Sequence, residues 1–202
     1  MPDYELETEA GGIVCGVDEA GRGPWAGPVV AGAAILDIAS LSDDLRTGLD
    51  DSKKLKATER ERLFALLQRD ATLGIGIADV DEIDRHNILQ ATLTAMARAV
   101  ANLEVKPGFA LIDGNKAPIL PCPARPIIRG DGRSLSIAAA SIVAKVTRDR
   151  IMTDLSHAHP GYGWERNAGY GTAEHRAALA RLGVTAQHRK SFKPIRKMLS
   201  PE

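Results

Sequence analysis

Four acidic residues stand where stretches of apolar sequence end. Asp18 and Glu19 directly follow one such stretch. Asp113 follows a second, and Asp131, between two glycines, follows a third. Carboxylates at the ends of buried strands are costly unless a cation neutralises them. If the fold brings the four together, their oxygens would bind a hard cation, and the lack of His or Cys among them favours Mg²⁺ or Mn²⁺ over Zn²⁺.

Each of these carboxylates also has an ordinary structural explanation. A single aspartate at a strand end is usually a turn or cap residue. Spacing along the chain does not show that the four side chains converge. The residues alone therefore leave two interpretations open, a metal site and four separate turn residues.

Two further segments are suited to contact with phosphate. In Gly21-Arg22-Gly23 the glycines allow a backbone to approach a ligand closely, and Arg22 can reach a phosphate, although so short a pattern also fits a tight turn. A polar stripe on one face of a predicted helix could lie against a phosphate backbone or simply face solvent. The stripe consists of Ser134, Ser141, Lys145 and Arg148. Asp149 is expected to pair with Arg148 or Arg150.

The elements that must position these residues follow from hydrophobic periodicity. Strands are predicted at 13–17, 29–36, 72–78, 109–113 and 126–129. Helices are predicted at 58–69 (opened by a capping box from Thr58 to Glu61), 87–103, 134–158 and 172–182, with a loop at 37–57. This order predicts a single α/β domain with a mixed sheet. From about residue 160 to 202, Gly, His, aromatic and basic residues replace the apolar period and indicate a basic surface arm rather than a second core.

Composition places the chain among ordinary globular proteins. It has 202 residues, of which 44% are hydrophobic and 26% charged. The two cysteines, Cys15 and Cys122, are too far apart in sequence for a paired-ligand zinc motif, which fits a reducing cytoplasm. The acidic start of the chain does not resemble a signal peptide, and no stretch approaches the roughly 20 apolar residues of a membrane span. We therefore expect a cytoplasmic protein without a membrane partner.

Charge is unevenly distributed although the formal net charge is zero. Residues 121–150 contain six basic and two acidic side chains, and residues 181–202 contain six basic and one acidic. Residues 37–51 hold five aspartates against one arginine. Such segregation can direct a polyanion to one face, although chance clustering on a solvated surface gives the same pattern.

Taken together, these segments resemble ribonuclease HII, the bacterial type 2 ribonuclease H. The matching stretches occur in the family's order over nearly the whole chain: VDEAGRGPWAGPVVAGAAIL, DDSKKL, EIDRHNILQATLTAM, LIDGN, RGD, SIAAASIVAKVTRDR, GYGT and HRKSF. The resemblance implies the ribonuclease H-like fold, a five-stranded mixed sheet flanked by helices. It also implies that Asp18, Glu19, Asp113 and Asp131 form an acidic metal-binding tetrad.

The resemblance assigns substrate-binding roles as well. It implies that Gly21-Arg22-Gly23 contacts the 2′-hydroxyl and a nearby phosphate of a ribonucleotide. Tyr170 matches a tyrosine that stacks on the sugar just past an RNA–DNA junction. Four basic residues match positions assigned to strand binding: Lys53, Lys145, Arg148 and Arg189.

The implied activity is cleavage of RNA paired with DNA. Two cations at the carboxylates would activate a water and stabilise the leaving 3′-oxygen, giving 5′-phosphate and 3′-hydroxyl ends. The expected partners are RNA–DNA hybrids and DNA duplexes that contain single ribonucleotides, and the expected state is a monomer.

Four other interpretations compete with this one. Ribonuclease HIII would have an extra N-terminal domain and a lysine in place of Arg22, whereas here the first strand is expected within about a dozen residues of Met1. A resolvase-like DNA nuclease would be indifferent to the 2′-hydroxyl. A non-catalytic nucleic-acid-binding module would not need all four carboxylates. An enzyme acting on small phosphate esters would not need the basic arm.

Overall fold

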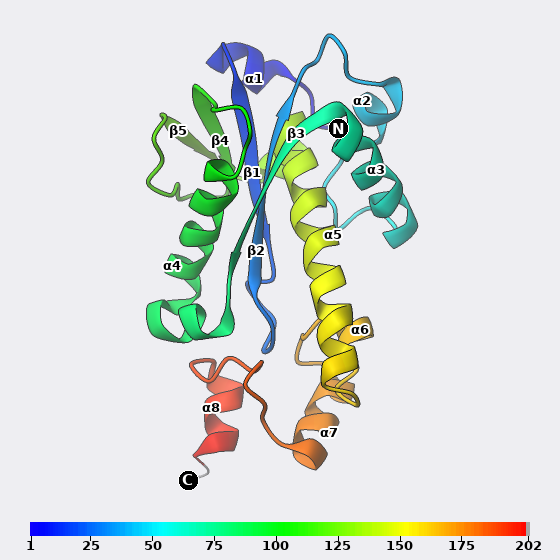
Figure 1. Ribbon diagram of the computed structural model, residues 1–202, viewed down its shortest axis with the longest axis vertical. Helices are drawn as coiled ribbons and strands as arrows, with labels where there is room; N and C mark the ends of the chain where they lie inside the picture. Colours follow the sequence, from blue (N-terminus) through cyan, green and yellow to red (C-terminus); the bar gives the residue numbers. More distant parts are fainter. Residues whose placement is uncertain (201–202) are drawn as a thin grey trace.

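A five-stranded mixed sheet forms the centre of the computed structural model, which describes residues 1–200 (Figure 1). The strands are β1 (Val14–Ala20), β2 (Val29–Leu36), β3 (Ala71–Ala78), β4 (Phe109–Asp113) and β5 (Ala124–Ile127). Their order in the sheet is β3-β2-β1-β4-β5. The pairs β1–β2 and β2–β3 are antiparallel, whereas β1–β4 and β4–β5 are parallel. The predicted mixed sheet is confirmed, although β1 continues through Asp18 and Glu19 to Ala20 instead of ending at residue 17, and β5 begins two residues earlier than expected.

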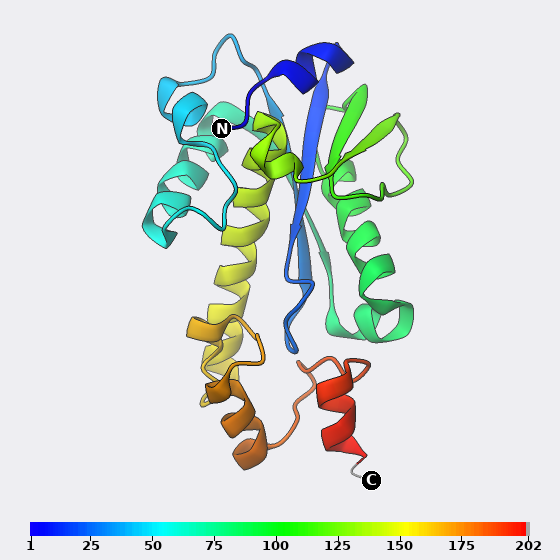
Figure 2. The same ribbon diagram turned by 180° about the vertical axis from the view of Figure 1, so that it is seen from behind.

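Helices cover both faces of this sheet (Figures 1 and 2). The long helix α4 (Val80–Ala101) packs on one face, and α5 (Leu135–Ala158) with α3 (Ala57–Asp70) packs on the other. The remaining helices are α1 (Glu5–Ala10), α2 (Asp43–Gly48), the short 3₁₀ helix η1 (Gly130–Gly132), α6 (Trp164–Asn167), α7 (Ala173–Leu182) and α8 (Lys193–Leu199). Within residues 1–200, no helix combines the length and hydrophobicity needed to cross a membrane.

Three predictions about helices are wrong in detail. The segment 37–57 contains α2 rather than loop alone. The capping box at Thr58 does not form, because α3 begins one residue earlier, after Lys56. The helix predicted at 87–103 corresponds to α4, which begins at Val80 instead of residue 87. Asn87 interrupts this helix with a φ of 67°. A capping box does occur at the true start of α4, between Asp79 and Glu82.

Helix α5 lies directly on the backbone of β1 and β2. A Cβ atom at Gly16 would lie 2.1 Å from the carbonyl carbon of Ser136, and one at Gly32 would lie 2.4 Å from the carbonyl oxygen of Ala140. Glycine is needed at both positions because any side chain would push the helix off the sheet. The two glycines therefore set the distance between α5 and β1, the strand that carries Asp18.

The polar stripe predicted on α5 does not face solvent. Ser134 is buried and caps the helix by accepting a hydrogen bond from the backbone amide of Ile137. Ser141 is also buried and donates to the hydroxyl of Ser52 at 2.7 Å. Because two of its four members serve packing and capping, the stripe is not a surface for a phosphate backbone.

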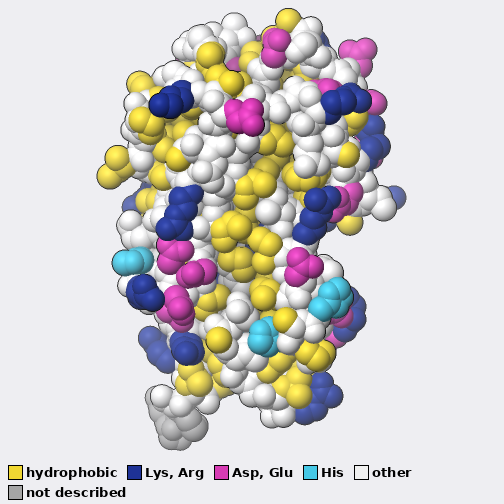
Figure 3. All heavy atoms as spheres, viewed as in Figure 1, with side chains coloured by type: hydrophobic (Ala, Val, Ile, Leu, Met, Phe, Trp, Pro, Cys, Tyr) yellow, Lys and Arg dark blue, Asp and Glu magenta, His cyan; other side chains and the backbone are white. Residues whose placement is uncertain are grey.

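The free edge of β3 is covered in part by α4. Arg98 donates to the carbonyl oxygen of Ile77 at 2.6 Å, and Asn102 donates to that of Ile75 at 2.8 Å. Hydrophobic side chains form a band between charged groups on the face seen in Figure 3, and Ile77 is one of the exposed hydrophobic residues of the sheet.

The C-terminal segment contains a small hydrophobic cluster, contrary to the expectation of an arm without its own core. Trp164 is fully buried at its centre. The other buried members are Ala26, Met152, Tyr162, Ala178, Leu179 and Ile195. Because Ala26 lies in the loop between β1 and β2, this cluster joins the C-terminal segment to that loop (Figure 2).

Candidate active site

Parallel pairing of β1 and β4 brings the first three candidate carboxylates together. Val17 lies opposite Ile112, so Asp18 and Asp113 are the next residues at the same end of neighbouring strands. Oxygen atoms of Asp18, Glu19 and Asp113 lie within 4.8 Å of one another. The structure thus places Asp113 beside two carboxylates that are far from it in the sequence.

The fourth candidate, Asp131, lies beside this group in η1. The preceding amide of Gly130 donates to Oδ1 of Asp113 at 2.7 Å and so connects η1 to the end of β4. Asp131 is buried, and its Oδ2 lies 3.3 Å from Nζ of Lys53. Its carboxylate therefore borders the cluster while Lys53 supplies a positive charge.

The carboxylates are held in an environment that disfavours their charge. Burial, followed by the charges of Glu19 and Asp113, raises the pKa of Asp18 well above its usual range. Burial also raises the pKa of Glu19. Burial and the neighbouring Asp131 raise the pKa of Asp113.

The same carboxylates stabilise the charged form of Lys53. Burial lowers its pKa, but the charges of Asp18, Asp51 and Asp131 outweigh this effect and raise it to about 12. One lysine cannot balance so many carboxylates. A divalent cation would relieve the remaining repulsion, and an all-oxygen donor set suits a hard metal ion. The residues present therefore fit a divalent metal.

All the substrate-binding candidates except Arg189 share a cavity with Asp18, Glu19 and Asp113. The cavity has a volume of about 220 Å³. It is lined by Asp18, Glu19, Asp113, Gly21, Arg22, Gly23, Ser52, Lys53, Lys145, Arg148 and Tyr170, with Ala20. Arg22 is exposed, and its Nη1 lies 3.4 Å from Oε1 of Glu19. The Tyr170 ring, 49% exposed, lies over Gly23, where a Cβ would be 3.3 Å from its Cε1.

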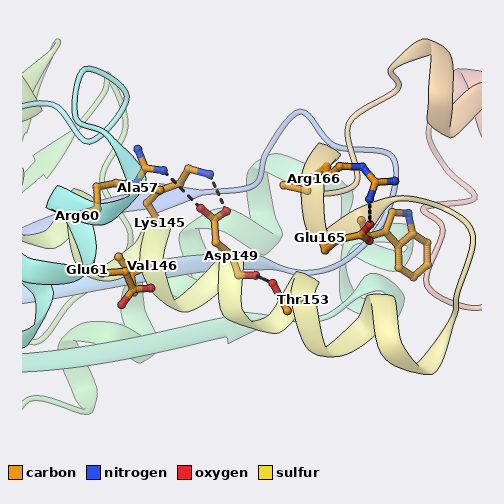
Figure 4. Close-up of a pocket in the computed structure, with 11 residues that line it drawn as sticks. Ala57, Arg60, Glu61, Lys145, Val146, Asp149, Thr153, Glu165 and Arg166 are labelled. Atoms are coloured by element: carbon orange, nitrogen blue, oxygen red, sulfur yellow. Dashed lines mark hydrogen bonds and ion pairs between the residues drawn. The ribbon is translucent and has the colours of Figure 1, made fainter.

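Lys145 lies between this cavity and a second hollow (Figure 4). Its Nζ is 2.6 Å from Oδ1 of Asp149, and Nη2 of Arg60 is 3.8 Å from the other oxygen of that carboxylate. The predicted pairing of Asp149 with Arg148 or Arg150 is therefore wrong. Arg148 lies beneath a loop, and Arg150 pairs instead with Glu61.

Arg148 and Arg189 occupy positions that the sequence did not predict. Their exposed fractions are 2% and 0%, and both lie beneath the loop between β1 and β2. Arg148 contributes to the cavity wall but is almost completely buried, and direct contact of the Arg189 guanidinium with a duplex would require that loop to move. We therefore revise the expectation that they bind a strand directly.

Two histidines that received no role from the sequence form a hydrogen-bonded pair next to Tyr170. Nδ1 of His175 is 3.0 Å from the carbonyl oxygen of Tyr170, and Nε2 of His175 is 3.1 Å from Nε2 of His188. Both rings are fully buried. The available signal was that each histidine lies within five residues of a proposed substrate-binding residue, one near Tyr170 and one next to Arg189.

The chain is similar to known proteins over nearly its whole length. The family model for ribonuclease HII matches residues 15–195. The chain is 62% identical to ribonuclease HII of Paramagnetospirillum magneticum over 195 residues, covering 96% of this chain and 97% of that protein. It is 59% identical to ribonuclease HII of Rhodospirillum rubrum over 202 residues, covering 99% and 93%.

Solved structures share the fold. The crystal structure of ribonuclease H2 from Pyrococcus horikoshii superposes with a TM-score of 0.78 at 27% identity, covering 93% of this chain and 97% of the other. Ribonuclease HIII in complex with Mn²⁺ superposes with a TM-score of 0.69 at 20% identity, covering 93% and 69%, and this likeness concerns the fold alone. The full-length match to the family model and to these close relatives shows that the chain belongs to the ribonuclease HII family and is an endoribonuclease of the ribonuclease H type.

Proposed function

We propose that the protein hydrolyses the RNA strand of RNA–DNA hybrids and also cuts on the 5′ side of single ribonucleotides in duplex DNA. The products would carry 5′-phosphate and 3′-hydroxyl ends. Members of the ribonuclease H family act on RNA–DNA hybrids with divalent metal ions, and the finer substrate and the pair of ions are our proposal.

One observation carries the proposal. The carboxylate cluster, the Gly21–Gly23 loop and Tyr170 line the same cavity. A metal-bound phosphate would therefore lie beside a backbone loop able to approach the 2′-hydroxyl of the same nucleotide. The 2′-hydroxyl is the group by which a protein tells RNA from DNA at one site.

The residues of the chain divide the work between them. Asp18, Glu19, Asp113 and Asp131 would hold two Mg²⁺ or Mn²⁺ ions, which supply Lewis acidity and an activated water when bound. Among residues 1–200, the amides of Arg22 and Gly23 make no backbone hydrogen bond, so both can donate to substrate.

Four side chains that line the cavity complete the proposed substrate site. The exposed Arg22 side chain can leave its ion pair with Glu19 and bind a phosphate instead. The exposed ring of Tyr170 can stack on a sugar, and Lys53 and Lys145, which also line the cavity, can approach the strands.

Cleavage of a labelled DNA duplex with one ribonucleotide tests the proposal directly. The assay compares Mg²⁺, Mn²⁺ and EDTA, beside an all-DNA duplex of the same sequence. We expect metal-dependent cutting on the 5′ side of the ribonucleotide and an intact control. Cutting of both duplexes would indicate a resolvase-like nuclease, and binding without cutting would indicate a non-catalytic module.

We also propose that the protein acts as a monomer in the cytoplasm. All residues of the candidate site come from one chain, so a second copy is not needed to complete it. Cys15 and Cys122 are free, which is compatible with a reducing compartment.

A further inference from the structure

The loop between β1 and β2 rests on two buried arginine side chains. Arg148 comes from α5 and Arg189 from the segment before α8, so they reach the loop from different parts of the chain. The Arg189 guanidinium also lies over the ring of Phe192, with its carbon 5.1 Å from the ring centroid. Neither arginine is adjacent in sequence to the residues it contacts.

Every hydrogen bond of these two guanidinium groups goes to a backbone carbonyl oxygen. Arg189 donates to Gly21 (2.6 Å), Arg22 (2.9 Å), Gly27 (2.9 Å) and Pro28 (3.1 Å). Arg148 donates to Ala26 (3.2 Å), Pro28 (3.0 Å) and Ala168 (3.0 Å). Both ends of the loop are therefore fixed from beneath, including two residues of the Gly21–Gly23 segment.

This arrangement fixes which backbone groups the loop presents. The carbonyl oxygens of Gly21 and Arg22 are directed inward to Arg189, leaving the amides of Arg22 and Gly23 without a backbone partner among the described residues. Gly21 adopts a φ of 98°, and a Cβ there would lie 2.0 Å from Nε of Arg148. The loop backbone thus fits closely onto the face of the Arg148 guanidinium, which only glycine permits.

The two positive charges also lack a carboxylate partner. Within residues 1–200 neither arginine forms an ion pair, and Asp149, next to Arg148, pairs with Lys145 and Arg60. Burial lowers the pKa of Arg148 to about 10, and burial together with the charge of Arg148 lowers that of Arg189 to about 9. Two unpaired buried charges are unfavourable in the free protein, and an anion above the loop would offset their cost.

We propose that Arg148 and Arg189 are positioning residues that hold the Gly21–Gly23 loop in the conformation that recognises a ribonucleotide, and so determine discrimination between RNA and DNA. They act through the loop and touch neither the substrate nor the metal ions. This inference rests on the proposed function, because it assumes that the loop reads the 2′-hydroxyl. The alternative is that the two arginines only hold the C-terminal segment on the sheet.

The test replaces each arginine by lysine, which keeps the charge but loses the forked hydrogen bonds. Dissociation constants are measured with Ca²⁺ for a duplex containing one ribonucleotide and for the all-DNA duplex, after checking by gel that neither is cut. Discrimination is the dissociation constant of the all-DNA duplex divided by that of the duplex with one ribonucleotide. We expect Arg189→Lys to reduce this ratio at least tenfold. In Mn²⁺, KM should rise more than kcat falls, and the Mn²⁺ concentration for half-maximal activity should not change.

Arg69→Lys is the matched control. Arg69 is exposed at the end of α3 and pairs with Asp70, away from the loop, so both binding constants should equal those of the wild type. A lower melting temperature of Arg189→Lys with an unchanged discrimination ratio would show a purely structural role and overturn the inference. A wild type without discrimination would instead overturn the proposed function.

A second variant and a measurement on the wild type cover the case in which Arg189→Lys does not fold. Arg148→Lys should reduce discrimination in the same direction, because it loses the hydrogen bonds to Ala26 and Pro28. In the native wild type, a held loop should resist trypsin at the bond after Arg22. Rapid cleavage there, identified by mass spectrometry, would show that the loop is not held and would overturn the inference without any variant.

Discussion

Asp18 is almost completely buried, yet the nearest charges that the structure places around it include two other carboxylates. A residue selected for stability at this position would be apolar or paired with a cation. The repulsion among Asp18, Glu19 and Asp113 is instead what makes the strand ends attractive to a divalent ion. At the scale of the residue, binding capacity and local stability oppose one another.

Replacing Asp18 or Asp113 by asparagine should separate these two effects. Each substitution removes a metal-binding oxygen charge, so we expect turnover to fall at least about a hundredfold. Because one repulsive charge is also removed, the melting temperature in EDTA should be equal to or higher than that of the wild type. The measurements are duplex cleavage and thermal unfolding. Asp70→Asn, which changes an exposed surface pair, is the control.

Normal activity of Asp18→Asn would remove that residue from the site. A large fall in melting temperature in EDTA would contradict the electrostatic account of the cluster, even if activity were lost.

Sequence reasoning succeeds for residues whose position in an element decides their role. Asp113 ends β4 and Asp18 lies near the end of β1, and parallel strands carry their ends to the same edge of a sheet. It fails for Arg148 and Arg189, because their burial depends on a loop that arrives from residues 21–28, more than a hundred positions earlier in the chain. The hydrophobic periodicity of one helix does not predict which distant loop will cover it.

At the scale of elements, the position of the site depends on how closely α5 approaches β1 and β2. Gly16 and Gly32 permit contact between helix and strand backbones. The same helix continues to Arg148, so one element connects β1, the strand that carries Asp18, with the loop that follows it. A shift of α5 would therefore displace the carboxylates and the loop together.

Gly32→Ala should destabilise the protein strongly. The added Cβ would lie 2.4 Å from the Ala140 carbonyl oxygen, and overpacking of this kind costs about 1–3 kcal/mol or more. Urea unfolding measures the change in free energy. The control is Gly108→Ala, where the nearest atom is 3.7 Å away. Equal stability of the two variants would mean that the helix can move aside without cost.

The strands were predictable because their apolar runs are short, β-branched and bounded by polar residues. The two wrongly predicted helix starts, those of α3 and α4, have a common cause, because the sequence contains more than one possible N-terminal cap for a helix. Thr58 and Glu61 have the spacing of a capping box, but the chain becomes helical one residue earlier. Asp79 and Glu82 do form a capping box, at the start of α4. The first turns of α4 are difficult to predict because Asn87 interrupts the helix.

At the scale of the whole molecule, two buried histidines connect separate parts of the C-terminal segment next to Tyr170. Nδ1 of His188 accepts from the amide of Thr185 at 2.9 Å, so its proton lies on Nε2, directed at His175. His175 donates from Nδ1 to the Tyr170 carbonyl oxygen, so its Nε2 accepts, including from Nε1 of Trp164 at 3.1 Å. A second proton on either ring would set two donors against each other.

This network predicts a loss of stability at mildly acidic pH. Burial, then the nearby His175, lowers the pKa of His188 from 6.5 to about 4. The unfolded chain therefore binds a proton at a higher pH than the folded protein. The stabilising contribution is complete above about pH 6.5 and is lost as the pH falls toward 4, amounting to on the order of 3 kcal/mol.

Unfolding free energies of the wild type and His188→Gln, measured in EDTA across that range, isolate the effect. Contributions of the carboxylate cluster are common to both proteins and cancel in the difference. The wild type should lose more stability than the variant as the pH falls from 6.5 to 4. Parallel curves for the two proteins would rule out His188 as the source.

Both edges of the sheet carry features that oppose strand addition. Arg98 and Asn102 occupy two carbonyl oxygens of β3, and β5 is a four-residue strand that contains Pro126, which has no N–H to offer. An incoming strand would find an interrupted row of partners at either edge. Two copies of the chain are thereby hindered from joining edge to edge into a continuous sheet, the arrangement from which fibres grow.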